Sequence, residues 1–135
     1  MQRKYKKGVF VCLIFLMACV TTPVSQKSAL ILVPIWQEVA LGRQAFNQVL
    51  EKEKESEDKE TARLIERMGK RIAEVSDMPD LEWEFRLIES KAQNAFALPG
   101  GKVAIYTGIL PVAQNEAGLA TVMSHEIAHV VARHG

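Results

Sequence analysis

Residues 116–135 read EAGLATVMSHEIAHVVARHG and combine an apolar helical pattern with a few polar residues. Apolar side chains cover most of the surface of a helix that begins at Glu116. A helix that is apolar nearly all round belongs in the interior of a protein. His125, Glu126 and His129 interrupt the apolar surface, and burying them without partners would cost free energy. The stretch therefore predicts a buried helix whose polar residues are satisfied by some partner.

The three polar residues form the pattern H-E-x-x-H. Residues four apart on a helix are offset by about 40°, so His125 and His129 can both bind one Zn²⁺ at about 2.0–2.1 Å. Glu126 lies about 100° around the helix from His125, where a carboxylate can take a proton from zinc-bound water and pass it to the leaving amine. The pattern predicts a zinc peptidase site. The alternative is two histidines hydrogen-bonded in a core beside a surface glutamate.

A hydrolytic zinc site needs a third protein ligand, and the sequence does not identify one. The chain does not continue as H-E-x-x-H-x-x-G-x-x-H, which excludes that class of metallopeptidase. His134 lies five residues after His129, which places it about 140° around a regular helix from that residue. Glu116 lies on the helix face opposite His125 and about 13 Å from it along the axis. Neither residue can therefore join the two histidines at one metal ion. Glu89, in the predicted strand region, is a conceivable third ligand, but nothing in the sequence favours it.

Upstream of this helix the apolar pattern has a period of two, which predicts strands. Residues 81–88 predict a strand with one buried face, made of Leu81, Trp83, Phe85 and Leu87, and with Ile88 among the residues of the other face. Residues 92–98 and 102–108 predict two more strands, joined by Pro-Gly-Gly, which suits a turn with positive φ at its second central residue. Asn115 is the predicted N-cap of the final helix.

The first half of the domain has helical periodicity. Apolar residues at intervals of three and four predict one helix after Pro34 and a second across residues 60–76. The stripe predicted to be buried on the second helix consists of Ile65, Met68, Ile72 and Val75. The charged run 51–60 is predicted to be a solvated helix end or an exposed connection. The fold class is therefore α+β, with two N-terminal helices, a small three-stranded sheet and the H-E-x-x-H helix.

The N-terminus has the pattern of a targeting signal. A basic start is followed by an apolar run too short to span a bilayer, and LMAC at residues 16–19 resembles a lipoprotein signal in which Cys19 carries the lipid. We expect residues 1–18 to be the signal peptide and 19–34 a tether. Val20 favours attachment to the outer membrane, facing the periplasm. An uncleaved anchor and other processing are the alternatives.

The net charge of the whole chain is +1, and four of its 17 Lys and Arg residues lie in the first seven positions. The remainder is mildly acidic, so no nucleic-acid partner is expected. Cys12 lies within the predicted signal, which leaves Cys19 as the one cysteine of the mature chain and excludes an internal disulfide.

The sequences QNAFALPGGKVAIYTGIL, EAGLATVMSHEIAHVVARHG and MGKRIAEVSDMPDL resemble the zinc metalloendopeptidases that include the CAAX prenyl protease and the heat-shock protease HtpX, especially the secreted bacterial lipoprotein branch. The resemblance implies that His125 and His129 bind zinc, that Glu126 is the general base, and that the strand through residues 94–98 follows the active-site cleft. One departure is Gly118, where an acidic residue is common. Glycine there is expected to weaken the helix by roughly 1 kcal/mol.

The family also has a glutamate zinc ligand on a later helix. Residues 35–135 are therefore expected to be the N-terminal part of a metallopeptidase domain, an incomplete zincin-like domain that by itself would be marginally stable and inactive, with its last helix partly uncovered. The expected function is quality control of misfolded envelope proteins by zinc-dependent cleavage. The first alternative is an inactive lipoprotein that binds unfolded chains. The second is a structural lipoprotein in which the motif is a coincidence.

Overall fold

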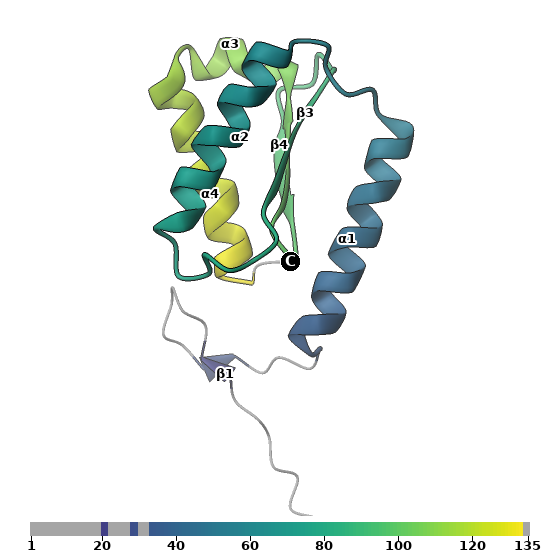
Figure 1. Ribbon diagram of the computed structural model, residues 1–135, viewed down its shortest axis with the longest axis vertical. Coiled ribbons are helices and arrows are strands. Elements are labelled where there is room, and N and C mark those ends of the chain that lie inside the picture. Colours follow the sequence, from purple (N-terminus) through teal and green to yellow (C-terminus); the bar gives the residue numbers. More distant parts are fainter. Residues whose placement is uncertain (1–19, 22–27, 30–32, 134–135) are drawn as a thin grey trace, which may run out of the picture.

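The computed structural model describes residues 20–21, 28–29 and 33–133 (Figure 1). Within these residues, two helices precede a three-stranded mixed sheet and another long helix follows it, which confirms the predicted α+β class and element order. The helices and strands are α1 (Ile35–Lys52), α2 (Lys59–Glu74), β3 (Glu84–Ile88), β4 (Ala95–Leu98), β5 (Lys102–Tyr106), η1 (Thr107–Ile109), α3 (Leu110–Ala113) and α4 (Glu116–Val131), preceded by β1 (Val20–Thr21) and β2 (Ser28–Ala29), which pair with each other. None of the helices in the described ranges is long and apolar enough to cross a membrane. The predicted signal peptide, Cys19 and His134 lie outside the described residues.

The central strand of the sheet is β5, which pairs in parallel with β3 and antiparallel with β4. The turn from β4 to β5 contains Pro99, Gly100 and Gly101. Gly100 has a φ of 86°, so the predicted positive φ is confirmed. Within the part of the chain that the structure describes, β4 has no strand on its other side and is an edge strand.

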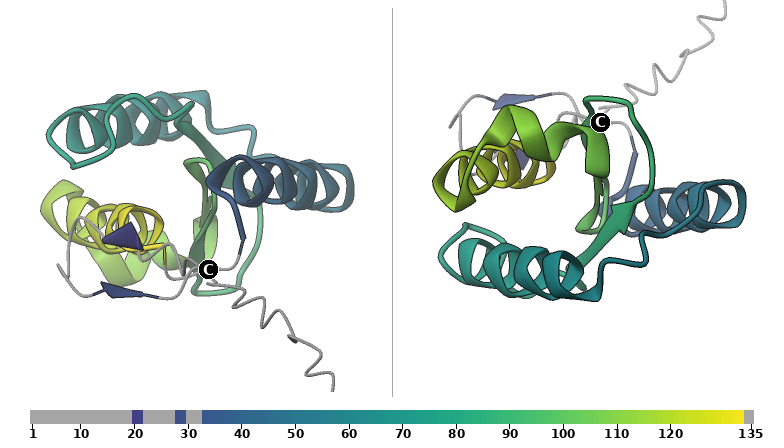
Figure 2. Two further views of the ribbon diagram at one scale, coloured as in Figure 1. Left: turned by 90° about the horizontal axis from the view of Figure 1, so that it is seen from below. Right: turned by 90° about the horizontal axis from the view of Figure 1, so that it is seen from above.

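Helices cover both faces of the sheet (Figure 2). On one face α2 and α4 pack against Phe85, Leu87, Val103 and Ile105. On the other face α1 places Phe46 against Ile88 and Ala104. The prediction that Ile88 lies on the solvated face of its strand was therefore wrong, because α1 covers that face and Ile88 is fully buried.

The apolar residues predicted on α1 and α2 include side chains that the structure leaves exposed to solvent. The stripe on α2 begins as expected with the fully buried Ile65, but Val75 is 86% exposed because the helix ends at Glu74 and Val75 is its C-cap. On α1, Phe46 is buried whereas Trp36 is 70% exposed. The first turns of α1 therefore have apolar side chains in solvent.

Two features determine how α4 begins, a hydrogen-bonded N-cap and a glycine in its first turn. The side chain of Asn115 accepts a hydrogen bond from the Gly118 N–H at 3.0 Å, which confirms the predicted N-cap. A Cβ at position 118 would lie 1.9 Å from the carbonyl oxygen of Ala113 at the end of α3. Glycine at position 118 therefore permits α3 and the first turn of α4 to pack closely, in addition to its expected effect on helix propensity.

Candidate metal centre

The way in which α4 packs on the sheet determines where its polar residues point. The buried side of α4 consists of Leu119, Met123, Ile127, Val130 and Val131. His125, two residues after Met123, is on the opposite side and exposed, whereas Glu126 and His129 are half-buried. The prediction that α4 is buried nearly all round was wrong for this side, which also exposes Thr121, Ser124 and Ala128.

The two histidine rings converge on this open side. Their Nε2 atoms lie 2.9 Å apart, in a hydrogen bond whose donor depends on the tautomer. The ring centroids are 4.5 Å apart and the planes are nearly perpendicular, at 89°. The structure thus brings together the two residues that the sequence predicted as metal ligands.

This geometry fits a shared zinc ion. Two nitrogens bound tetrahedrally at 2.0–2.1 Å would be roughly 3.3–3.4 Å apart, so the rings would separate by a few tenths of an ångström to accept the metal. His129 also lies in the last turn of α4, where the helix dipole favours a cation. The two imidazoles therefore offer zinc both suitable donor atoms and a favourable field.

A third protein ligand is not assembled with the pair. Among residues 20–21, 28–29 and 33–133, no three His, Cys, Asp or Glu side chains form a group that could hold a metal. Within these residues, neither Glu116 nor Glu89 forms such a group with the two histidines. The third ligand was left open by the sequence, and the described residues do not supply it.

The edge strand β4 lies against the same helix. Ala95 and Ala97 pack towards the core formed with α2 and α4, and Ala97 and His129 line one cavity. The Tyr106 N–H donates to the Asn94 carbonyl at 3.0 Å. In an antiparallel pair, hydrogen-bonded and non-hydrogen-bonded positions alternate, so the register places Phe96 in a hydrogen-bonded pair and Ala97 in a non-hydrogen-bonded pair. The backbone N–H and C=O of Ala97 therefore point away from β5, towards the unoccupied edge.

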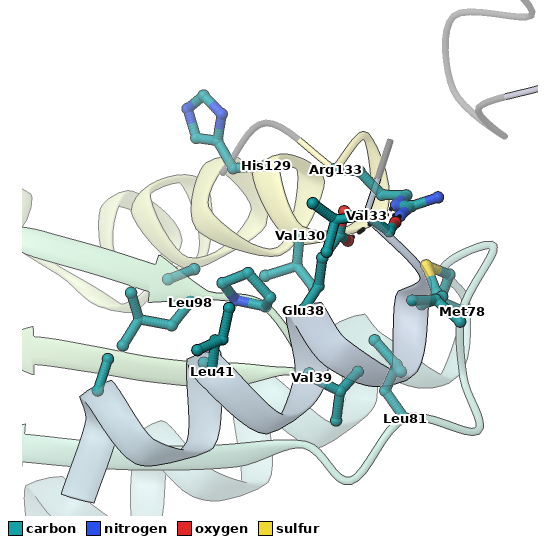
Figure 3. A pocket seen from close by; sticks show the side chains of 16 residues that line it. Val33, Glu38, Val39, Leu41, Met78, Leu81, Leu98, His129, Val130 and Arg133 are labelled. Carbon is teal, nitrogen blue, oxygen red and sulfur yellow. Dashed lines mark hydrogen bonds and ion pairs between the residues drawn. The ribbon is translucent and has the colours of Figure 1, made fainter. Parts of the chain in front are cut away.

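An apolar cavity of about 370 Å³ lies beside this edge (Figure 3). Its walls come from α1, the β4–β5 turn, the loop that contains Met78 and Leu81, and the end of α4. His129 stands at the rim, with its ring directed away from the apolar floor. The sequence predicted the helix after Pro34, which is α1, but did not identify its contribution to this cavity.

An ion pair between α1 and the end of α4 lines the cavity. Arg133 donates from Nε and from an Nη atom to the Glu38 carboxylate, at 3.0 and 2.7 Å, and from an Nη to the Val33 carbonyl at 3.3 Å. Arg133 adopts a left-handed φ of 55° just after α4 ends. The pair joins the start of α1 to the end of α4, 95 residues later, and no local sequence signal could have indicated it.

An H-E-x-x-H helix packed on a small mixed sheet, with an edge strand beside the histidines, is the arrangement of a metallopeptidase. Residues 59–135 match Peptidase family M48, and the chain belongs to this family. The predicted resemblance is confirmed. The match begins at the start of α2, so α1 lies outside it.

Several curated proteins are similar in sequence. The mitochondrial metalloendopeptidase OMA1 of Schizosaccharomyces pombe is 53% identical over 74 residues, which is 55% of this chain and 22% of the relative. The beta-barrel assembly-enhancing protease of Escherichia coli is 32% identical over 100 residues, 74% of this chain and 20% of the relative. The putative beta-barrel assembly-enhancing protease of Vibrio cholerae is 41% identical over 70 residues, 52% of this chain and 14% of the relative. The chain thus spans about one fifth of the length of these relatives or less.

Proposed function

We propose that this protein is a zinc-dependent metalloendopeptidase of the bacterial cell envelope that cleaves misfolded or misassembled envelope proteins. The observation that carries the proposal is the convergence of the His125 and His129 Nε2 atoms, 2.9 Å apart, on a helix beside an edge strand. Membership of Peptidase family M48 supports the reaction type. The names of the bacterial relatives support the envelope, whereas relatives named as mitochondrial show that the family is not confined to it.

The chemistry follows from the positions of the side chains. Zinc held by His125 and His129 would supply a Lewis acid for the scissile carbonyl and lower the pKa of water. Glu126, one residue after His125, would accept the proton of the attacking water and later donate it to the leaving amine. The outward N–H and C=O of Ala97 would hold the substrate backbone in an extended conformation by adding it to the edge of β4.

Removal of zinc is the direct test of this proposal. A hydrolytic zinc site needs a third protein ligand, so the test uses a preparation in which that ligand is present. We expect it to cleave casein, to lose cleavage with 1,10-phenanthroline, and to regain it when zinc is restored. Zinc content measured on the same samples should follow activity. Binding of unfolded casein without chelator-sensitive cleavage would instead support the inactive binding protein. Absence of zinc after purification in zinc-containing buffer would support a coincidental motif.

Attachment through Cys19 is the second part of the proposal. Replacement Cys19→Ser should abolish labelling by radioactive palmitate in a bacterial host and move the protein from the membrane fraction to the soluble fraction. The matched control is Cys12→Ser, which changes a cysteine within the predicted signal peptide and should leave both labelling and fractionation unchanged. Equal labelling of the Cys19→Ser variant would contradict lipid attachment at this residue.

A further inference from the structure

The cavity beside His129 has the character of a binding site for an apolar group. Its volume of about 370 Å³ is in the range that small ligands occupy. Val39 and Leu41 from α1, Leu98 from β4 and Val130 from α4 contribute aliphatic side chains to its walls, and Met78 adds a flexible thioether. Such a surface favours aliphatic or aromatic groups, because it removes them from water without burying a polar atom.

The charged groups of the cavity are already paired. The guanidinium of Arg133 is held by Glu38 and by a backbone carbonyl, and the side chains of Arg133 and Glu38 are 12% and 24% exposed. An acidic or basic ligand group would therefore have to compete with this ion pair for a partner. The pairing favours an uncharged occupant.

The position of the cavity identifies that occupant. A peptide added to β4 at Ala97 would lie between α4 on one face of the sheet and α1 on the other, because the two helices cover opposite faces. Side chains of a strand alternate between the two faces, so those on the α1 face would be directed towards Leu41 and Leu98. The same peptide would pass the rim at His129.

We propose that this cavity is the subsite that selects the substrate, and that it accepts an aliphatic or aromatic side chain close to the scissile bond. The inference rests on the proposed function and adds to it the class of residue that the enzyme recognises. It also assigns a role to α1, which lies outside the residues that match the family. The spacing between α1 and the β4–β5 turn is kept small by Gly42, where a Cβ would lie 2.0 Å from the Pro99 carbonyl oxygen.

The test uses a substitution on the cavity wall that should not disturb folding. Leu41 lines the cavity and is 55% exposed, so Leu41→Asp introduces a charge at the wall without burying it. The matched control is Val112→Asp on α3, because Val112 has the same exposure of 55% and does not line the cavity. Both variants should unfold at the same denaturant concentration as the wild type.

The measurement compares peptides that differ at one position near the cleaved bond, which carries either Leu or the uncharged, similarly shaped Asn. We expect the wild type and Val112→Asp to prefer Leu by about tenfold or more in kcat/KM at one of these positions, and Leu41→Asp to lose most of that preference. Equal preference in Leu41→Asp and the wild type would overturn the subsite.

A binding measurement separates failure of the subsite from failure of the proposed function. Fluorescence anisotropy of the same peptides on the Glu126→Gln variant reports affinity without turnover. Preferential binding of the Leu peptide that Leu41→Asp removes, with no chelator-sensitive cleavage by the wild type, would support the subsite and reject the enzyme. Chelator-sensitive cleavage with no preference at any position would reject the subsite and retain the enzyme.

Discussion

Replacement of Glu126 by Gln is expected to reduce the rate of chelator-sensitive casein cleavage by roughly 10²–10⁴-fold, the contribution usual for a positioned general acid or base. The amide has nearly the same shape as the carboxylate but cannot accept the proton of the attacking water. Glu126 is half-buried on α4, next to His125, and the substitution leaves both imidazoles in place. Zinc content should therefore stay at the wild-type level.

The histidine variant His129→Ala provides the contrast. Removing one imidazole of the pair should lower both zinc content and cleavage, because only the His125 imidazole then remains to bind the metal. The two variants thus separate a proton-transfer role from a ligand role. Full zinc-dependent activity in Glu126→Gln would show that another group is the base, and loss of zinc from that variant would make Glu126 a ligand.

Much of the final helix and its site could be predicted because the determining interactions are local. The N-cap at Asn115 depends on a residue three positions away, and the convergence of His125 and His129 follows from the 3.6-residue period of the helix. The positive φ at Gly100 likewise follows from a turn sequence of a few residues. Local chemistry was sufficient in each of these cases.

The errors concern contacts between distant segments. Ile88 was predicted on a solvated face, and it is buried because α1, about forty residues earlier in the chain, packs on that face of the sheet. Trp36 has the periodicity of a core residue but lies in solvent, since periodicity identifies an apolar face and not the element that covers it. The strand order β3-β5-β4 also depends on long-range pairing.

The candidate site likewise has one part set by local spacing and another set by contacts between distant segments. The two ligands and the base lie within five residues and could be identified from spacing alone. The cavity is formed by four separate segments, and the ion pair that lines it joins Glu38 to Arg133. No pattern within one segment contains that information.

Proline at Ala97 should impair cleavage by at least about tenfold while leaving the fold largely intact. The N–H of Ala97 points away from β5, so proline removes no hydrogen bond of the sheet, and edge strands tolerate it. The substitution does remove the donor that would pair with an added substrate strand and places the ring in its path. Loss of about 1.4 kcal/mol of substrate binding corresponds to the expected tenfold change in kcat/KM.

The neighbouring position, Phe96, supplies the control. Phe96 belongs to a hydrogen-bonded pair with Ala104, so Phe96→Pro removes a bond of the sheet and leaves a carbonyl without its donor, at a cost of about 1–3 kcal/mol in unfolding free energy. Its ring also contacts Tyr106, with centroids 6.1 Å apart. Denaturant unfolding should therefore shift for Phe96→Pro far more than for Ala97→Pro. A wild-type rate of peptide cleavage in a folded Ala97→Pro protein would rule out β4 as the strand that binds substrate.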